Sequence, residues 1–341
     1  MYEMKKVTIY DIAKEANVSP SMVSRVINGS GPVKKEKAEK ILQIIKKYNY
    51  VPNALARSLT KKESRTIGII LPDISNPFFV QIYKEAEKRA LEHGYNIILG
   101  NSFSDYRIES LYLKSFLEKQ VDGIIFLGGR INACKLDEKY IKEMAEIKSK
   151  VPIITVNGIY EGSSTLNIVT DEEKGFRDLV EFIAKRGYKE VGIILGEKCI
   201  SSTETKREYF LKYVKEYNLS TSKEWITYSG FSVEAGKKGI EKLLKSKKLP
   251  EVIMCINDIV AMGAIRELVS RGFKVPDDIK VTGFDDIELA ESFIPSLTTV
   301  DQNYTEIGKL IIDVLVEKSF EDSLPEKVSI ETKLKVRESC S

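Results

Sequence analysis

The side chains that most often carry out catalysis are few and isolated in this chain of 341 residues. Its one histidine, His93, lies in LEHGY, where Gly94 is typical of a helix end, so the imidazole is expected at the negative pole of a helix. No GxGxxG, P-loop or GxSxG motif occurs. The sequence therefore predicts a protein that has no catalytic residues and no bound cofactor.

The cysteines do not form a recognisable site either. They are far apart, with no CxxC pair and no Cys/His cluster, which argues against a zinc site and against a disulfide framework. No metal site is predicted. We expect four ordinary thiols in a reducing compartment: Cys134, Cys199, Cys255 and Cys340.

Basic charge is concentrated at the N-terminus. Residues 1–65 contain 14 Lys and Arg against 6 Asp and Glu, a balance of +8, whereas the rest of the chain, with 39 against 44, has a balance of −5. A basic head on a mildly acidic body is expected when one end binds phosphate groups. No apolar run approaches the ~20 residues that span a bilayer, and the N-terminus lacks the apolar region of a signal peptide. These features predict a cytoplasmic protein that does not bind membranes.

Residues 8–28 predict two short helices joined by a tight turn. Thr8 is placed to cap the first helix and Ser19 the second, and Pro20 suits the first turn of a helix. The second helix then has an apolar inner face and an outer face that carries polar side chains. A third helix is expected from Lys35 to Tyr48, with these residues facing inward: Ala38, Ile41, Leu42 and Ile45.

These residues resemble a known family. The pattern VTIYDIAKEANVSPSMVSRVING, followed by YNYVPNALARSLTKKESRTIGIILPDISNPFF, is similar to the lactose-repressor (LacI/GalR) family, and the resemblance extends to about residue 337. It implies a small all-α helix-turn-helix head plus an α/β two-lobed periplasmic-binding-protein type-1 body with parallel sheets. The head would span residues 1–50, a hinge 51–65 and the effector-binding and dimerisation body 66–341. Within the body, lobe 1 would take 66–158 and 303–319, and lobe 2 would take 159–302 and 320–341.

The resemblance places the second helix in the major groove of DNA. Arg25 can then form a bidentate pair with guanine, while Ser21 and Pro20 occupy the other base-reading positions. The alternative for Arg25 is an ordinary surface arginine. Lys34, where the family usually has a serine, leaves the third helix without a capping hydroxyl but retains attraction to phosphate. The positions expected to bind phosphate, some of which could serve only as caps, are Thr8, Tyr10, Ser19, Ser24, Asn28 and Lys34.

The hinge would form a short helix that is too short to be stable alone. By resemblance it becomes ordered only when it pairs with its dimer mate on DNA. Leu59, with Ala56 beside it, then inserts into the minor groove and unstacks a base step. The alternative is an ordinary linker that happens to contain a leucine.

From Thr66 onward, apolar segments alternate with amphipathic ones, which predicts parallel sheets covered on both faces by helices. The expected strands are 66–72, 95–100, 122–128, 151–157, 190–196, 252–256 and 279–284. The expected helices are 77–93, 105–119, 171–186, 203–217, 232–246 and 258–271.

Ligands of open parallel sheets bind beyond the carboxyl ends of the strands. Polar residues that follow strands are therefore candidates for ligand binding: Asp73, Asn101, Asn157 and Asp285. The resemblance adds Phe78, Phe231, Asn257 and Lys206, the last at a position where the family usually has arginine. Asp285 and Asn257 could instead be helix caps and Phe231 could be core. Asp258 and Asp286 are expected to be caps and surface residues.

Together these features predict a sequence-specific DNA-binding transcriptional regulator, a repressor, whose operator affinity is switched by a small molecule bound between the lobes. A sugar fits best, since carboxylates accept hydroxyl hydrogen bonds and an aromatic ring covers an apolar face. The resemblance also implies a homodimer on palindromic double-stranded DNA. The alternatives are a global carbon-catabolite-type regulator controlled by a phosphorylated partner protein, a sugar-binding transport protein and an α/β enzyme.

Overall fold

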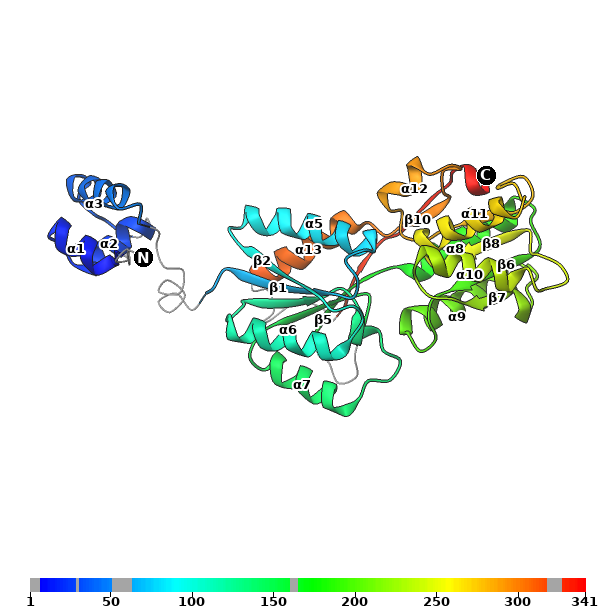
Figure 1. Ribbon diagram of the computed structural model, residues 1–341, viewed down its shortest axis with the longest axis horizontal. Coiled ribbons are helices and arrows are strands. Elements are labelled where there is room, and N and C mark those ends of the chain that lie inside the picture. Colours follow the sequence, from blue (N-terminus) through cyan, green and yellow to red (C-terminus); the bar gives the residue numbers. More distant parts are fainter. Residues whose placement is uncertain (1–6, 29–30, 51–62, 160–164, 318–326) are drawn as a thin grey trace, which may run out of the picture. The chain divides into compact units, whose positions relative to one another are not determined.

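The computed structural model describes residues 7–28, 31–50, 63–159, 165–317 and 327–341. The chain divides into two units, Met1–Ser64 and Arg65–Ser341, which are described separately below (Figure 1). The predicted minor-groove residues Leu59 and Ala56 lie outside the described residues, as does the side chain of Asn28. None of the helices in the described ranges is long and apolar enough to cross a membrane.

The first unit contains three helices, α1 (Ile9–Ala16), α2 (Pro20–Asn28) and α3 (Lys35–Lys47). Thr8 caps α1 in a full capping box with Asp11, and Ser19 accepts a hydrogen bond from the backbone of Met22 at the start of α2. These caps satisfy amide groups that have no partner within the helix.

The small core of this unit lies on one stripe of α3. Ile41 is fully buried and Ile44 is 7% exposed, and both pack against Ile12 and Val23. The expectation that Leu42 faces inward is wrong, because its side chain is 52% exposed. It lies one residue, about 100°, further round the helix than Ile41 and misses the face that α1 and α2 cover.

The second unit contains two parallel sheets. The first has the order β11-β5-β4-β3-β1-β2. Its helices α5 and α13 pack together on one face, and α6 and α7 lie on the other (Figure 1). The strands are β1 (Thr66–Leu71), β2 (Asn96–Asn101), β3 (Gly123–Phe126), β4 (Ile153–Val156), β5 (Leu166–Thr170) and β11 (Lys327–Ile330). The helices are α5 (Pro77–Glu92), α6 (Tyr106–Glu118), α7 (Glu138–Lys148) and α13 (Tyr304–Val316), with a short 3₁₀ turn η1 (Gly129–Asn132) after β3.

The second sheet has the order β7-β6-β8-β9 and forms the core of the second lobe. Its helices pack as two pairs, α8 with α9 and α10 with α11. The strands are β6 (Val191–Leu195), β7 (Ile226–Tyr228), β8 (Val252–Cys255) and β9 (Lys280–Thr282), and a separate antiparallel pair joins β10 (Thr299–Asp301) to β12 (Lys333–Lys335). The helices are α8 (Glu172–Lys185), α9 (Ser201–Glu216), α10 (Val233–Leu243), α11 (Asp258–Ser270) and α12 (Glu288–Ser292), with 3₁₀ turns η2 (Lys223–Trp225) and η3 (Glu338–Cys340).

The boundaries of the lobes differ from the prediction. β5, which was assigned to lobe 2, pairs with β4 in the first sheet, and β11 pairs with β5. The described chain crosses between the lobes after β5, after β10 and after β11. β5 was missed because LNIVT contains the buried polar residue Asn167, whose side chain accepts a hydrogen bond from Thr155. A strand that buries an amide does not produce a continuous apolar run.

Candidate functional sites

A cavity of about 90 Å³ lies between the two lobes, at the carboxyl ends of both parallel sheets. We call it the interlobe cavity. The first lobe contributes Asn76, Phe78, Phe79, Leu127, Asn132, Val156 and Asn157. The second lobe contributes Glu172, Ser202, Lys206, Phe231, Ile256, Asn257 and Asp285, and Gln302 comes from the crossover between β10 and α13. The cavity therefore combines amides, two carboxylates and an ammonium group with aromatic rings.

The charge of the cavity centres on Lys206, in the second turn of α9. Its side chain is only 6% exposed, and its Nζ lies 3.1 Å from Glu172 Oε1 and 4.2 Å from the centre of the Phe284 ring. Glu172 is the first residue of α8, directly after the crossover that follows β5. One buried ammonium group is thus held against a carboxylate and an aromatic face, which offsets part of the cost of its burial.

Asp285 is the second carboxylate beside this ammonium group. Burial raises its pKa well above the usual range, while the charge of Lys206 and a hydrogen bond from Gln302 act in the opposite direction. The backbone φ of Asp285 is +123°, in a region that residues other than glycine rarely adopt. Such strain is maintained only where the surrounding structure enforces it, and it is common at binding sites.

Gln302 connects the two lobes inside the protein. Its Nε2 donates a 2.6 Å hydrogen bond to Asp285 Oδ1 on the second lobe. Its Oε1 accepts from Thr170 Oγ1 at 2.6 Å and from Asn157 Nδ2 at 3.2 Å, both on the first lobe. Asn157 is oriented in turn because its Oδ1 accepts from the backbone of Thr170. The amide of Gln302 therefore links both sides of the interlobe cavity.

A buried ion cluster holds η1, the turn that brings Asn132 to the cavity. The guanidinium of Arg130 is fully buried and pairs with Glu109 and Glu143, each at 2.5 Å. Its Nη2 also donates to the carbonyl of Tyr106. Because both carboxylates belong to α6 and α7, the position of Asn132 is tied to these two helices.

Six of the eight predicted cavity residues line the interlobe cavity: Phe78, Asn157, Lys206, Phe231, Asn257 and Asp285. Asn257 is both a helix cap and a lining residue, since its Oδ1 accepts from the backbone of Val260. Asp73 and Asn101 do not line it. Their side-chain oxygens accept from the backbone of Ser75 and Ile74, so both residues shape the loop before α5.

Asp258 and Asp286 were expected to be caps and surface residues; neither lines the interlobe cavity, but the expectation that they lie at the surface is wrong. Asp258 is fully buried and accepts hydrogen bonds from Thr299 Oγ1 and from the backbone of Ile287. Asp286 pairs with Arg337 at 2.8 Å, and both side chains are mostly buried. The contacts of Asp258 and Asp286 therefore fix the backbone segment on which Asp285 lies.

Other lining residues were not predicted from the sequence: Asn76, Phe79, Asn132, Glu172, Ser202 and Gln302. Asn76 could have been found, because an asparagine before Pro77 is a typical helix start, and its Oδ1 caps α5. Glu172 follows the missed strand β5. Nothing in the local sequence distinguishes Gln302.

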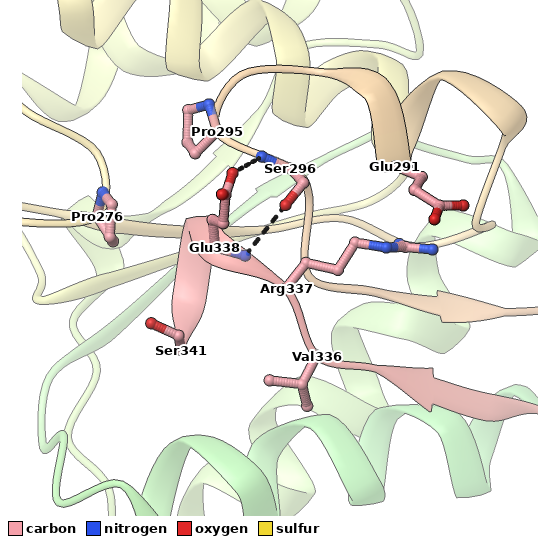
Figure 2. A pocket seen from close by; sticks show the side chains of 8 residues that line it. All are labelled: Pro276, Glu291, Pro295, Ser296, Val336, Arg337, Glu338 and Ser341. Atoms are coloured by element: carbon pink, nitrogen blue, oxygen red, sulfur yellow. Dashed lines mark hydrogen bonds between the residues drawn. The ribbon is translucent and has the colours of Figure 1, made fainter.

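A larger hollow, of about 840 Å³, lies at the end of the second lobe near the C-terminal residue (Figure 2). Two of its charged side chains already have partners. Glu338 accepts from the backbone of Ser296, and Arg337 pairs with Asp286 and donates to the carbonyl of Leu297. Because its lining belongs to one lobe, lobe movement would not change it, and we do not assign a ligand to it. The lining residues are Pro276, Glu291, Pro295, Ser296, Val336, Arg337, Glu338 and Ser341.

In the helical unit, the outer face of α2 is accessible. Ser21 and Arg25 are exposed, and Pro20 is half-buried. Ser24 on the same helix is half-buried. Lys34 is exposed and makes no side-chain capping bond to α3, as its residue type predicts.

Two predicted phosphate ligands have local roles. The Thr8 hydroxyl donates to Asp11 Oδ2 at 2.7 Å within the capping box. The Ser19 hydroxyl accepts from Met22 and lies 2.9 Å from the Ser21 hydroxyl. Tyr10, in contrast, is 71% exposed and carries its hydroxyl on the surface of α1.

Comparison with known proteins gives a consistent result over both units. Residues 8–53 match the family described as bacterial regulatory proteins, lacI family, and residues 180–340 match a periplasmic binding protein-like domain. Catabolite control protein A of Priestia megaterium is 34% identical over 313 residues, which cover 91% of this chain and 92% of that protein. The ribose operon repressor of Haemophilus influenzae is 30% identical over 311 residues, 91% of each chain. The crystal structure of the lac repressor dimer bound to operator and the anti-inducer ONPF has the same fold, with a TM-score of 0.87 at 24% identity over 98% of this chain and 99% of that one.

Proposed function

Because this chain belongs to the lacI family of bacterial regulatory proteins, we propose that it is a repressor whose affinity for a palindromic operator is set by a neutral sugar bound in the interlobe cavity. The single observation that carries the choice of ligand is the composition of that cavity. The amides of Asn157 and Asn257 and the carboxylate of Asp285 line the cavity together with the rings of Phe78 and Phe231. Hydroxyl groups pair with such oxygens and amides, and the apolar face of a sugar packs on aromatic rings.

The electrostatics of the cavity favour a neutral ligand over an anionic one. Lys206 is the cation among the lining residues, and Glu172 already pairs with it at 3.1 Å. A phosphate group would have to displace Glu172 or lie beside two carboxylates, which costs more than one ammonium group returns. Lysine also lacks the planar fork with which arginine binds phosphate or carboxylate at two points.

The small size of the cavity indicates that the two lobes move when a ligand binds. Ligand cavities in proteins commonly measure about 300–1,000 Å³, whereas the interlobe cavity measures about 90 Å³. Entry of a sugar therefore requires the lobes to separate and then to settle around it. Such a hinge movement is a common way for a ligand to change the geometry of a distant element.

The DNA-binding side of the proposal rests on α2 and on the segment that follows the head. Arg25, Ser21 and Pro20 would read base edges, and Lys34 and Tyr10 would bind phosphate. Leu59 and Ala56, outside the described residues, would open the minor groove in a homodimer. A cytoplasmic location follows from the DNA partner.

Control of catabolic genes by a phosphorylated partner protein is a second candidate, and one of the similar proteins is named catabolite control protein A. In that case the cavity need not bind a free sugar. The same experiment separates the two candidates.

The test is a thermal-shift screen of the full-length protein against neutral sugars, sugar phosphates and purine nucleosides, followed by operator titrations for each hit. A sugar at about 100 times its Kd should stabilise the protein by about 2.7 kcal/mol and change its affinity for an operator selected from random DNA. Asp285→Asn should lose this response. Asp73→Asn should retain it, because Asp73 does not line the cavity. A response only to sugar phosphates, or none to any small molecule while DNA binding persists, would refute the neutral-sugar proposal.

A further inference from the structure

Two exposed cysteines from different lobes lie opposite each other beside the interlobe cavity. Cys134 follows η1 in the first lobe, and Cys199 lies in the loop between β6 and α9 in the second. The backbone N–H of Cys134 donates to the carbonyl of Cys199 at 3.1 Å. Ala133 and Ile200, the adjacent residues, form an antiparallel bridge. The two lobes therefore meet at this point through paired backbone segments.

This pairing brings the backbones of the two cysteines side by side, as a disulfide between them requires. In an antiparallel pair, the residue after Ala133 lies opposite the residue before Ile200. In regular antiparallel strands, opposed residues joined by a backbone hydrogen bond have Cα atoms about 5.5 Å apart, and disulfides span Cα separations of about 4.4–6.8 Å. Cys199 departs from regular strand geometry, with a backbone φ of +64°. The charge of Cys199 is among the causes that raise the pKa of Cys134, after burial.

We propose that Cys134 and Cys199 are a modification site, at which a reversible disulfide locks the two lobes together. Hydrogen peroxide is the oxidant. One thiolate attacks the peroxide, the O–O bond breaks, and a sulfenic acid and water form. The second thiolate attacks the sulfenic sulfur, the S–S bond forms and the S–O bond breaks, which releases a second water. Two thiols and one hydrogen peroxide thus give one disulfide and two waters, and a thiol reductant reverses the change by exchange.

The other two cysteines are protected from this reaction. Cys255 is 2% exposed and Cys340 is fully buried. Burial raises the pKa of both thiols, that of Cys340 to about 12. Because their sulfur atoms are also shielded from peroxide, both should remain reduced when the exposed Cys134 and Cys199 are oxidised. They provide an internal reference for thiol counting.

The location gives the disulfide a consequence. Asn132 and Ser202, close in sequence to the two cysteines, line the interlobe cavity. A covalent bond at this edge prevents the lobes from separating there, so it closes this side of the cavity. The cross-link itself does not depend on the ligand, whereas any effect on operator binding rests on the proposed function.

The first experiment identifies the bond. Full-length protein is treated with hydrogen peroxide, alkylated under native conditions and then digested for peptide mapping by mass spectrometry. We expect a single intramolecular link between the peptides of Cys134 and Cys199, a chain that stays monomeric on a non-reducing denaturing gel, and reversal by dithiothreitol. Cys134→Ser and Cys199→Ser should abolish the link, and Cys255→Ala should keep it. Links between chains, or overoxidised cysteines with no internal link, would overturn the proposal.

The second experiment measures the lock without sugar or DNA. Hydrogen–deuterium exchange of residues 129–134 and 197–202 is compared between oxidised and reduced protein. Oxidation should slow exchange at least tenfold in the wild type and leave Cys134→Ser unchanged. A link that forms without slower exchange overturns the locking role. Because no ligand takes part, this result stands apart from failure of the proposed function.

Discussion

Single side chains should separate the reading of bases from attraction to phosphate. Arg25 is exposed on α2 and is proposed to read a guanine, whereas Lys34 is exposed before α3 and is proposed to attract phosphate as a point charge. Arg25→Ala should lose about 1–3 kcal/mol of discrimination at one base pair. Lys34→Ala should weaken binding evenly across sequences and reduce the salt slope by about 0.9. Selection from random DNA, with titrations at several salt concentrations, measures both. Equal losses at all sequences for Arg25→Ala would remove it from the base-reading face.

The ammonium group in the cavity should matter for stability as well as for binding. Lys206→Met leaves the nearly buried Glu172 without its partner, and breaking a buried pair in this way costs about 3–5 kcal/mol. Lys212→Met is a matched control on the same helix, because Lys212 pairs with Glu173 at 2.6 Å but both side chains are about half exposed. That loss should stay below about 1 kcal/mol. Urea unfolding at pH 7 compares the two variants. Similar losses would mean that the cavity is far better hydrated than the burial of Lys206 implies.

Asp258 makes stability depend on pH. Burial raises its pKa to about 7, and the neighbouring Asp286 adds to this, while hydrogen bonds from Thr299 and Ile287 oppose it. Between the unfolded pKa of about 3.9 and the folded value, the folded protein holds more protons, so stability falls as pH rises. The loss of stability caused by ionising Asp258 is absent below this pH range and complete above it.

Asp258→Asn should remove this slope. The asparagine can still accept from Ile287 and can donate to Thr299, so the local structure should persist. Relative to the variant, the wild type should lose up to about 1.4 kcal/mol per pH unit between pH 4 and 7, with no further divergence above pH 7. Urea unfolding at each pH gives the two curves. Parallel curves across this range would show that Asp258 stays ionised in the folded protein.

At the scale of elements, the packing of α10 on α11 depends on glycine. A Cβ at Gly236 would overlap the backbone carbonyl of Val260, and backbone cannot rotate away. A Cβ at Gly239, on the same helix, would have the Ile194 side chain as its nearest neighbour, at 2.6 Å. Gly236→Ala should therefore destabilise the protein by about 3 kcal/mol or more, whereas Gly239→Ala, whose added methyl displaces a side chain rather than backbone, should cost less, about 1–3 kcal/mol. Thermal and urea unfolding distinguish them, and equal effects would contradict a backbone contact.

The strands that could be predicted are those whose burial on both faces produces a continuous run of apolar residues. Strands β1, β3, β6 and β8 are continuous apolar runs because both of their faces are covered. β5 carries a buried amide and β11 is an edge strand with exposed side chains, so neither shows that pattern. The expectation that ligands bind beyond the carboxyl ends of strands identified Asn157 and Asp285 correctly. It also selected Asp73 and Asn101, whose side-chain oxygens instead accept hydrogen bonds from backbone amides of the loop before α5. The position of a residue after a strand does not show whether its side chain already forms hydrogen bonds with the nearby backbone.

At the scale of the whole molecule, the lobes are joined by side-chain hydrogen bonds of two kinds, besides the backbone contact at Cys134 and Cys199. Gln302 links Asp285 to Thr170 and Asn157 in the buried interior. Gln81 on α5 also reaches across, to Glu288 on α12 at 3.2 Å, but in an exposed position where water can replace it. The buried link resists lobe separation because its groups would need new partners, whereas the exposed one costs little to break.

This difference predicts which glutamine couples ligand to DNA. Gln302→Met keeps the side-chain volume and removes hydrogen bonds to both lobes, each worth about 0.5–1.5 kcal/mol. The ratio of operator affinities with and without an effective sugar should fall at least about fivefold, a large part of a typical allosteric coupling of 1–3 kcal/mol. Gln81→Met should leave the ratio unchanged. Fluorescence anisotropy titrations of labelled operator measure it for both variants. If Gln302→Met lowers thermal stability but leaves the ratio intact, the buried amide serves only to hold the lobes together and the signal passes elsewhere.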